Sequence, residues 1–204
     1  MLTLPVTDAA TLDAAAGALA AGEAIVVPTD TVYGLAARPE DPAAVERVYA
    51  AKGRPAQLHL PVMAASLEQV QALGVEFGAS ARTLAARWWP GPLTMVLGFD
   101  APRPPWLAGR DEVAVRIPAF AFLLELITRT GVLVVTSANR HGTPTPTSSQ
   151  EVADMLEPHV TMLVDGGALE STPSTLVNLR AGGVIEREGA IAAEEIERAL
   201  AAAS

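Results

Sequence analysis

The sequence predicts a single domain of the layered α/β class. Segments with the spacing of amphipathic helices alternate with short apolar or alternating segments, typical of strands, along most of the chain. Half of the 204 residues are apolar, which is ample for one continuous core. No internal repeat and no long linker divides the sequence, so we expect one domain over residues 1–204.

The first elements bring a polar loop and a lysine to the ends of regular structure. The alanine-rich segment 8–21 predicts an amphipathic helix, and it leads into the short apolar strand 24–27. That strand ends at Pro28-Thr29-Asp30-Thr31. A second helix, 42–51, delivers Lys52 at its end.

The middle of the chain predicts two strands around a pair of helices. Strand 58–63 precedes helices at 66–73 and 80–88. The second helix must stop at Trp89-Pro90-Gly91-Pro92, because two prolines and a glycine prevent its continuation. The apolar segment 93–99 then predicts a buried strand.

A proline-rich surface loop at 101–105 is followed by the alternating strand 112–117, which carries Arg116. After a helix at 120–129, four consecutive β-formers at 132–135 predict a central strand buried on both faces. This strand runs into Thr136-Ser137-Ala138-Asn139. Polar residues at the end of such a strand are well placed to contact a ligand.

The stiff threonine and proline loop 142–149 is a candidate lid, although a static surface loop fits it equally well. Ser148 or Ser149 is expected to cap the helix that follows. The remaining predicted elements are strands at 162–164, 175–179 and 184–187, and a helix at 192–203.

The composition argues against several classes of function. Without cysteine the chain has no disulfide, thiolate nucleophile or thiolate metal site, and three scattered histidines argue against a histidine-built metal site. No apolar run approaches a membrane span, and residues 1–10 do not resemble a secretory signal, so we expect a cytoplasmic protein without membrane contact. A net charge of −9 and a pI near 4.8 argue against a broad nucleic-acid-binding face.

Lys52 is the only lysine beside thirteen arginines, and it lies in Lys52-Gly53-Arg54-Pro55. A compact ammonium suits a phosphate, whereas a guanidinium prefers a bidentate partner. Biased composition explains a single leftover lysine equally well. Several cations nevertheless fall in or beside loops, so a cationic hollow in an acidic body is consistent with a small anionic substrate. They are Lys52, Arg54, Arg116, Arg140 and Arg187.

Standard phosphate loops and the nucleophile elbow of acyl hydrolases are absent from the sequence. Short hydroxyl side chains instead cluster at element ends, and each cluster has an ordinary structural reading. Residues 29–31 can form a capped turn, Ser137 and Asn139 can cap a helix, and Ser174 can be a plain strand residue.

Six segments, in order, resemble the motifs of the YrdC-like L-threonylcarbamoyladenylate synthases, in the short, single-domain form of that family. The resemblance spans residues 28–189 and implies an open twisted mixed β-sheet flanked by helices, with a central substrate cleft. The matching segments are Pro28-Thr29-Asp30-Thr31-Val32-Tyr33-Gly34-Leu35, Lys52-Gly53-Arg54-Pro55, Trp89-Pro90-Gly91-Pro92-Leu93-Thr94, Val115-Arg116-Ile117-Pro118, Ser137-Ala138-Asn139 and Pro173-Ser174-Thr175.

The resemblance implies a nucleotidyltransferase. Such an enzyme converts L-threonine, bicarbonate and ATP into threonylcarbamoyl-AMP and pyrophosphate, for N6-threonylcarbamoyladenosine modification of tRNA by a downstream threonylcarbamoyl transferase. Magnesium would arrive with ATP, with no metal ligand in the chain. Catalysis would rest on positioning and on cations around the phosphates, because no protein nucleophile is required.

Residue roles follow from the same motif matches. Lys52 and Arg54 would grip phosphates, and Ser137 and Asn139 would hydrogen-bond the nucleotide or the carbamate; these four are the expected catalytic residues. The expected ATP site adds Thr145 and Arg187 to them. The expected L-threonine site consists of Arg116, which would clamp the carboxylate, with Thr29 and Ser174.

The sequence departs from the family pattern at four places, which are Asp30 in place of glutamate, Leu58-His59-Leu60 in place of Asn-Pro-Leu, Met63 in place of a histidine, and Arg140-His141-Gly142 in place of Leu-Ser-Gly. Two other functions stay open. One is a non-catalytic module that binds structured RNA, and the other is a carbamoyl transferase that uses carbamoyl phosphate.

Overall fold

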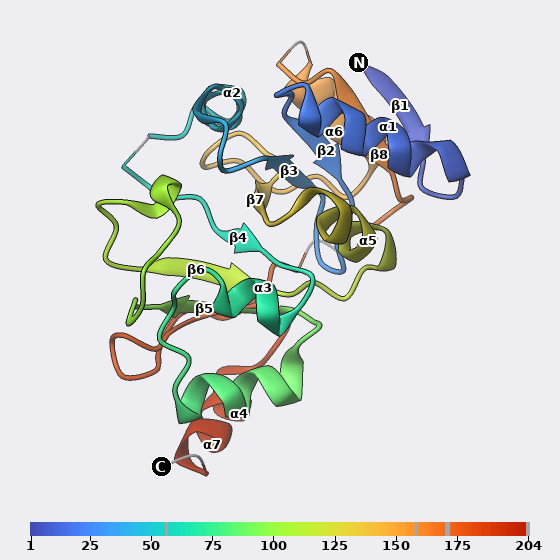
Figure 1. Cartoon of the computed structure of the whole chain (residues 1–204). Helices are drawn as coiled ribbons and strands as arrows, with labels where there is room; N and C mark the ends of the chain where they lie inside the picture. Colours follow the sequence, from blue (N-terminus) through green and yellow to red (C-terminus); the bar gives the residue numbers. More distant parts are fainter. Residues whose placement is uncertain (56, 158, 170–171, 203–204) are drawn as a thin grey trace.

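In the computed structural model, residues 1–55, 57–157, 159–169 and 172–202 are described, and they form one mixed β-sheet flanked by helices (Figure 1). The strands are β1 (Leu2–Pro5), β2 (Ile25–Val27), β3 (Gly34–Ala37), β4 (Val62–Met63), β5 (Leu93–Leu97), β6 (Val113–Arg116), β7 (Leu133–Ser137), β8 (Met162–Asp165), β9 (Thr175–Asn178) and β10 (Val184–Arg187). The α-helices are α1 (Ala9–Ala20), α2 (Pro42–Lys52), α3 (Leu67–Gln71), α4 (Ala79–Trp88), α5 (Ala121–Thr130), α6 (Ser149–Leu156) and α7 (Ala193–Ala201), and a 3₁₀ turn covers Pro105–Leu107.

The sheet runs in the order β1-β8-β2-β3-β7-β4-β6-β5-β9-β10. It is mixed, because the β1–β8, β2–β8, β4–β6 and β5–β9 pairs are parallel and the others antiparallel. This arrangement confirms the predicted α/β class with an open mixed sheet. Strand β7 lies in the middle of the sheet with Leu133, Val134 and Val135 buried, as its run of β-formers predicted.

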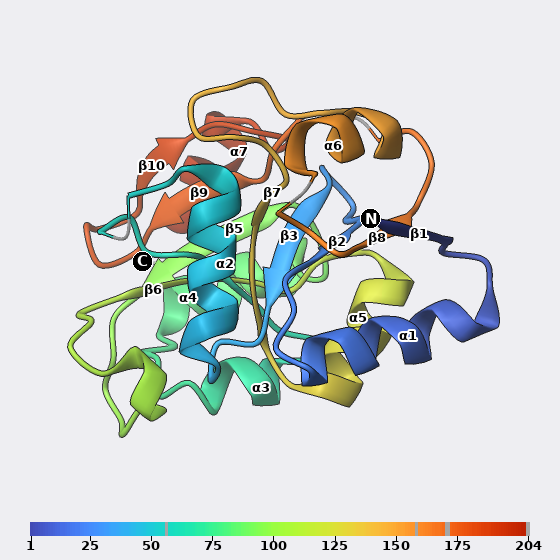
Figure 2. The same ribbon diagram turned by 90° about the horizontal axis from the view of Figure 1, so that it is seen from above.

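Two hydrophobic clusters fill the two sides of the sheet, as the alternation along β2 shows. Val26 belongs to the cluster that includes apolar side chains of α2, α4, α6 and α7, whereas Ile25 and Val27 belong to the cluster under α1 and α5. Helices α1 and α5 lie side by side (Figure 2). The apolar face of each helix is therefore buried against the sheet.

Helix α2 has clear start and stop signals, and these fix the place of Lys52. Asp41 caps its first turn by accepting hydrogen bonds from Ala43 N at 3.0 Å and Ala44 N at 3.2 Å. Gly53 ends the helix in the left-handed conformation, with φ at 58°. Lys52 is therefore the last helical residue, as predicted. Ser148 caps α6, also as predicted.

The sequence-based prediction was wrong or incomplete at three strands. It missed β1 and β3, and it placed a strand over 58–63 where β4 covers Val62–Met63. Residues before Pro61 turn instead, because Leu58 N donates to Pro55 O at 3.0 Å. The end of the last predicted helix, Ala203, lies outside the described residues. Among the described helices, none is long and apolar enough to cross a membrane.

Candidate active site

A cavity of about 310 Å³ opens over the central strands. Its polar lining consists of Thr29, Thr31, Arg54, His59, Thr94, Arg116, Thr136, Ser137, Thr145, Ser174 and Arg187. The apolar lining consists of Val32, Gly34, Pro61, Met63, Ala114, Val135, Pro173 and Leu176. No carboxylate belongs to this lining among the described residues, so the cavity is cationic although the chain carries a net charge of −9. The predicted cationic hollow is thus present, with Arg54, Arg116 and Arg187 in its wall.

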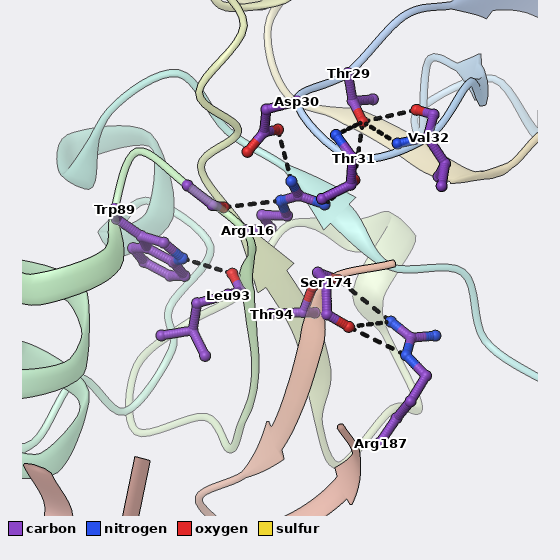
Figure 3. A network of polar contacts seen from close by, with 11 residues as sticks. Thr29, Asp30, Thr31, Val32, Trp89, Leu93, Thr94, Arg116, Ser174 and Arg187 are labelled. Atoms are coloured by element: carbon purple, nitrogen blue, oxygen red, sulfur yellow. Dashed lines mark hydrogen bonds and ion pairs between the residues drawn. The ribbon is translucent and has the colours of Figure 1, made fainter. Parts of the chain in front are cut away.

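Arg116, the last residue of β6, is fixed by acceptors from two loops (Figure 3). Its Nε donates to Gly91 O at 3.0 Å, its Nη1 donates to Thr31 Oγ1 at 2.9 Å, and its Nη2 forms an ion pair with Asp30 Oδ1 at 2.6 Å. The side chain is buried. Burial lowers the pKa of Arg116, and the carboxylate of Asp30 acts in the opposite direction. Because a guanidinium has five donors, two are left for a ligand.

The loop after β2 holds Thr29 and Thr31 in a tight turn. Thr29 Oγ1 accepts from the backbone N–H groups of Thr31 and Val32, both at 3.1 Å, and donates to Val32 O at 2.7 Å. It also lies 3.0 Å from Thr31 Oγ1. The hydroxyl of Thr29 is therefore committed to the turn, and it presents the neighbouring Thr31 to Arg116. The sequence prediction assigned Thr29 to substrate and gave Thr31 no role of its own.

Ser174 connects a second guanidinium to the cavity (Figure 3). Arg187 donates to Ser174 O through Nε at 3.1 Å and through Nη2 at 2.8 Å, and Nη2 also lies 3.2 Å from Ser174 Oγ. Ser174 Oγ lies 2.8 Å from Thr94 Oγ1. Burial lowers the pKa of Arg187, and the positive charge of Arg116 lowers it further. Two guanidinium groups therefore repel each other across this part of the cavity, which favours an anion between them.

Lys52 lies behind the cavity wall and organises the turn after β7. Its ammonium donates to Ser137 O, to Asn139 O at 2.7 Å and to Asn139 Oδ1 at 3.0 Å. Asn139 Oδ1 also accepts from Ser137 Oγ at 2.6 Å, and Asn139 Nδ2 donates to Thr143 O at 2.6 Å. Burial, with a contribution from the charge of Arg54, lowers the pKa of Lys52 to about 8.

The four predicted catalytic residues lie in two layers, with Arg54 and Ser137 in the cavity lining and Lys52 and Asn139 behind it. Lys52, Ser137 and Asn139 are joined by hydrogen bonds, and of these three only Ser137 lines the cavity among the described residues. Lys52 has all three of its donors occupied, so in this structure its charge lies behind the wall.

Arg54 lines the cavity beside segment 58–60, which differs from the family pattern. Its Nε donates to Leu58 O at 3.0 Å and its Nη2 to His59 O at 3.3 Å. His59 belongs to the same wall, and its pKa is lowered by burial and by the charge of Arg110. Thr145 of the threonine and proline loop lies in the lining, whereas Arg140 lies outside it.

The sequence prediction missed several lining residues, and some signals were available for them. Thr94 lies in the quoted Trp89–Thr94 motif, and Thr136 precedes Ser137 on the predicted central strand. Strand pairing brings Thr94 opposite Leu176 and Met63 opposite Arg116, and this pairing cannot be read from one sequence. The roles assigned to the site residues stay predictions.

Metal binding by the chain itself finds no support in the arrangement of side chains. Within the described ranges, no group of three or more His, Asp or Glu side chains is placed to hold a metal ion. The lining offers guanidinium, hydroxyl and imidazole groups, which suit an anion. A magnesium ion in this cavity would therefore find its oxygen ligands mainly on a bound phosphate.

Comparison with known proteins identifies a family model that matches most of the chain. The family model Sua5_yciO_yrdC, described as "Telomere recombination", matches residues 17–189. The chain is 40% identical over 190 residues to a threonylcarbamoyl-AMP synthase of Pyrococcus abyssi and 37% identical over 186 residues to one of Bacillus subtilis, with 91% and 85% of the chain covered. It spans only 56% and 54% of the lengths of those two relatives.

A solved structure is also similar over nearly the whole chain. The crystal structure of P. abyssi Sua5 complexed with L-threonine superposes with a TM-score of 0.88 at 37% sequence identity. The superposition covers 97% of the present chain and 60% of that protein.

Proposed function

This chain belongs to the Sua5/YciO/YrdC family, and from that premise we propose that it is a threonylcarbamoyl-AMP synthase. The substrates would be L-threonine, bicarbonate and ATP, with magnesium carried on the triphosphate. The observation that carries the proposal is a cavity whose described lining contains no carboxylate. Arg54, Arg187 and the anchored guanidinium of Arg116 all belong to that lining.

The first step joins the amine of threonine to carbon dioxide supplied by bicarbonate. The nitrogen lone pair forms the new C–N bond, and loss of one proton from nitrogen leaves a carbamate anion. The two unused donors of Arg116 suit a bidentate contact with the threonine carboxylate, which would hold the amine in a fixed place. Thr31 and Ser174 add hydroxyl groups to the lining of the same cavity.

In the second step a carbamate oxygen attacks the α-phosphorus of ATP, and the bond to pyrophosphate breaks. Negative charge builds up around the α-phosphate and on the leaving group. Arg54 and Arg187 would offset this charge from the cavity wall, while Lys52 would add a positive charge behind Ser137. A magnesium ion bound to the triphosphate would neutralise its oxygens further.

Preference for threonine over serine would depend on an apolar contact with one methyl group. Met63 is paired with Arg116 across β4 and β6 and lines the cavity, so it is the candidate contact beside the proposed carboxylate site. One methyl group gives a discrimination of only about 1–3 kcal/mol. Serine should therefore be a weaker substrate.

The test is release of pyrophosphate from ATP with magnesium and bicarbonate, compared among L-threonine, L-serine and no amino acid. Release that depends on both threonine and bicarbonate supports the proposal. Absence of release, with no binding of threonine or ATP by calorimetry, contradicts it. Turnover that requires carbamoyl phosphate would instead support a carbamoyl transferase, and tRNA affinity with a steep salt dependence would support an RNA-binding module. The product would be consumed by a threonylcarbamoyl transferase acting on tRNA in the cytoplasm.

A further inference from the structure

Asp30 is the carboxylate that accompanies the buried guanidinium of Arg116. Among the described residues, no other carboxylate forms an ion pair with either Arg116 or Arg187. The Asp30 side chain is itself only 12% exposed, and its Oδ1 lies 2.6 Å from Arg116 Nη2. Both charges are thus largely removed from water. In such a buried environment a charge-assisted hydrogen bond has well-defined geometry.

Asp30 contacts Arg116 from outside the described lining of the cavity. Arg116 lines the cavity, whereas Asp30 is not part of the described lining. Figure 3 shows Asp30 and Thr31 on one side of the guanidinium and Ser174 and Arg187 on the other. The Nε of Arg116 also donates to Gly91 O. The three contacts engage three different nitrogens of the guanidinium, so they fix both its position and its rotation.

We infer that Asp30 is a positioning residue, which aims the two remaining donors of Arg116 into the cavity and thereby sets the affinity for the substrate carboxylate. This inference rests on the proposed function. It assigns Asp30 no contact with substrate, which separates it from Arg116 itself.

The contact requires charge as well as shape. Asp30→Asn keeps an oxygen acceptor at the same distance but removes the negative charge, and a charge-assisted hydrogen bond is about twice as strong as a neutral one. Arg187 adds to the effect, because its positive charge lowers the stability of a second cation nearby, as its lowered pKa also indicates. Without the charge of Asp30, the guanidinium of Arg116 loses its strongest anchor.

The experiment measures pyrophosphate release by the full chain while L-threonine and ATP are varied separately. For Asp30→Asn we expect the KM for threonine to rise roughly tenfold, with kcat and the KM for ATP changed by less than about threefold. Asp30→Glu, which restores the carboxylate, should recover most of the affinity for threonine. Calorimetric titration with threonine alone gives the same comparison without turnover.

A matched control is Asp13→Asn, which removes the carboxylate of an exposed pair with Arg129 at 2.7 Å. It should leave both KM values unchanged. An unchanged KM for threonine in Asp30→Asn, or an equal rise in both KM values, would overturn the inference. Complete inactivity of the unsubstituted chain would contradict the proposed function instead. If Asp30→Asn does not fold, Asp30→Ser replaces it, because it also removes the carboxylate. A rise confined to the KM for threonine supports the inference, and equal rises in both KM values overturn it.

Discussion

Replacement of Arg116 by lysine tests whether a planar fork, and not only a positive charge, is needed at this position. Three different nitrogens of Arg116 contact Gly91 O at 3.0 Å, Thr31 Oγ1 at 2.9 Å and Asp30 Oδ1 at 2.6 Å. A lysine ammonium carries its donors on a single nitrogen at the end of a flexible stem. It can keep the ion pair with Asp30, but it cannot reach the other two acceptors in the same arrangement.

The expected cost can be worked out from these contacts. Hydrogen bonds to charged groups contribute about 1.5–3 kcal/mol each, and partial relaxation recovers some of the loss, so Arg116→Lys should lower the free energy of unfolding by about 2–4 kcal/mol. A typical domain of this size stays folded after such a loss. Loss of the bidentate contact should raise the KM for threonine roughly 30- to 100-fold, which corresponds to about 2–3 kcal/mol.

Two measurements check this prediction. Urea unfolding gives the stability, and pyrophosphate release at increasing threonine concentration gives the KM. Arg129→Lys is the matched control, because Arg129 also pairs with carboxylates but on the surface. It should leave the KM for threonine unchanged. A KM for threonine in Arg116→Lys equal to that of the unsubstituted chain would refute the assignment of the guanidinium fork to the carboxylate.

Three further predictions follow from the cavity and its surroundings. A Cβ atom at Gly34 would lie 2.5 Å from Val135 Cγ1, so Gly34→Ala should cost about 1–3 kcal/mol in urea unfolding, and Val135→Ala in the same chain should recover part of it. Folding lowers the pKa of Lys52 from 10.5 to about 8. Between these pH values the unfolded chain binds one more proton than the folded chain, so the free energy of unfolding should rise with pH. This rise should vanish in Lys52→Met. A flat difference between the two proteins from pH 8 to 10 would contradict this assignment. Chelation of magnesium should abolish pyrophosphate release without changing the melting temperature, since the described side chains form no metal cluster; a lower melting temperature would point to a structural metal.

Much of the fold could be predicted from local patterns. The apolar run before Thr136 identified a buried central strand, and the cap at Asp41 with Gly53 explains why the helix before Lys52 ended where the sequence indicated. Strand β3 was missed because Gly34-Leu35-Ala36-Ala37 has little intrinsic preference for strand, and its conformation depends on pairing with β2 and β7. Strand β1 is paired with β8, more than 150 residues away along the chain, which no local window contains.

The candidate site was predicted in composition but not in its layering. The motif residues Thr29, Arg54, Arg116, Ser174 and Arg187 do line one cavity. A sequence cannot show that Lys52 faces backbone carbonyls, because the direction of a side chain depends on the helix packing that buries it. The sequence likewise indicated only a turn at Asp30. Its pairing with Arg116, 86 positions away, depends on the fold.

The burial of Lys52 has a practical consequence for chemical labelling. Because the chain has a single lysine, an amine-directed acylating reagent can modify only one side chain besides the terminal α-amine. Digestion with mass spectrometry separates the Lys52 peptide from the N-terminal one. A pKa near 8 leaves a substantial unprotonated, nucleophilic fraction at mildly alkaline pH, so access rather than chemistry limits the reaction. With only 3% of its surface exposed, Lys52 reacts only when the turn around Ser137 and Asn139 opens. The acylation rate of Lys52 therefore measures how often the cavity wall opens. Bound nucleotide should lower this rate.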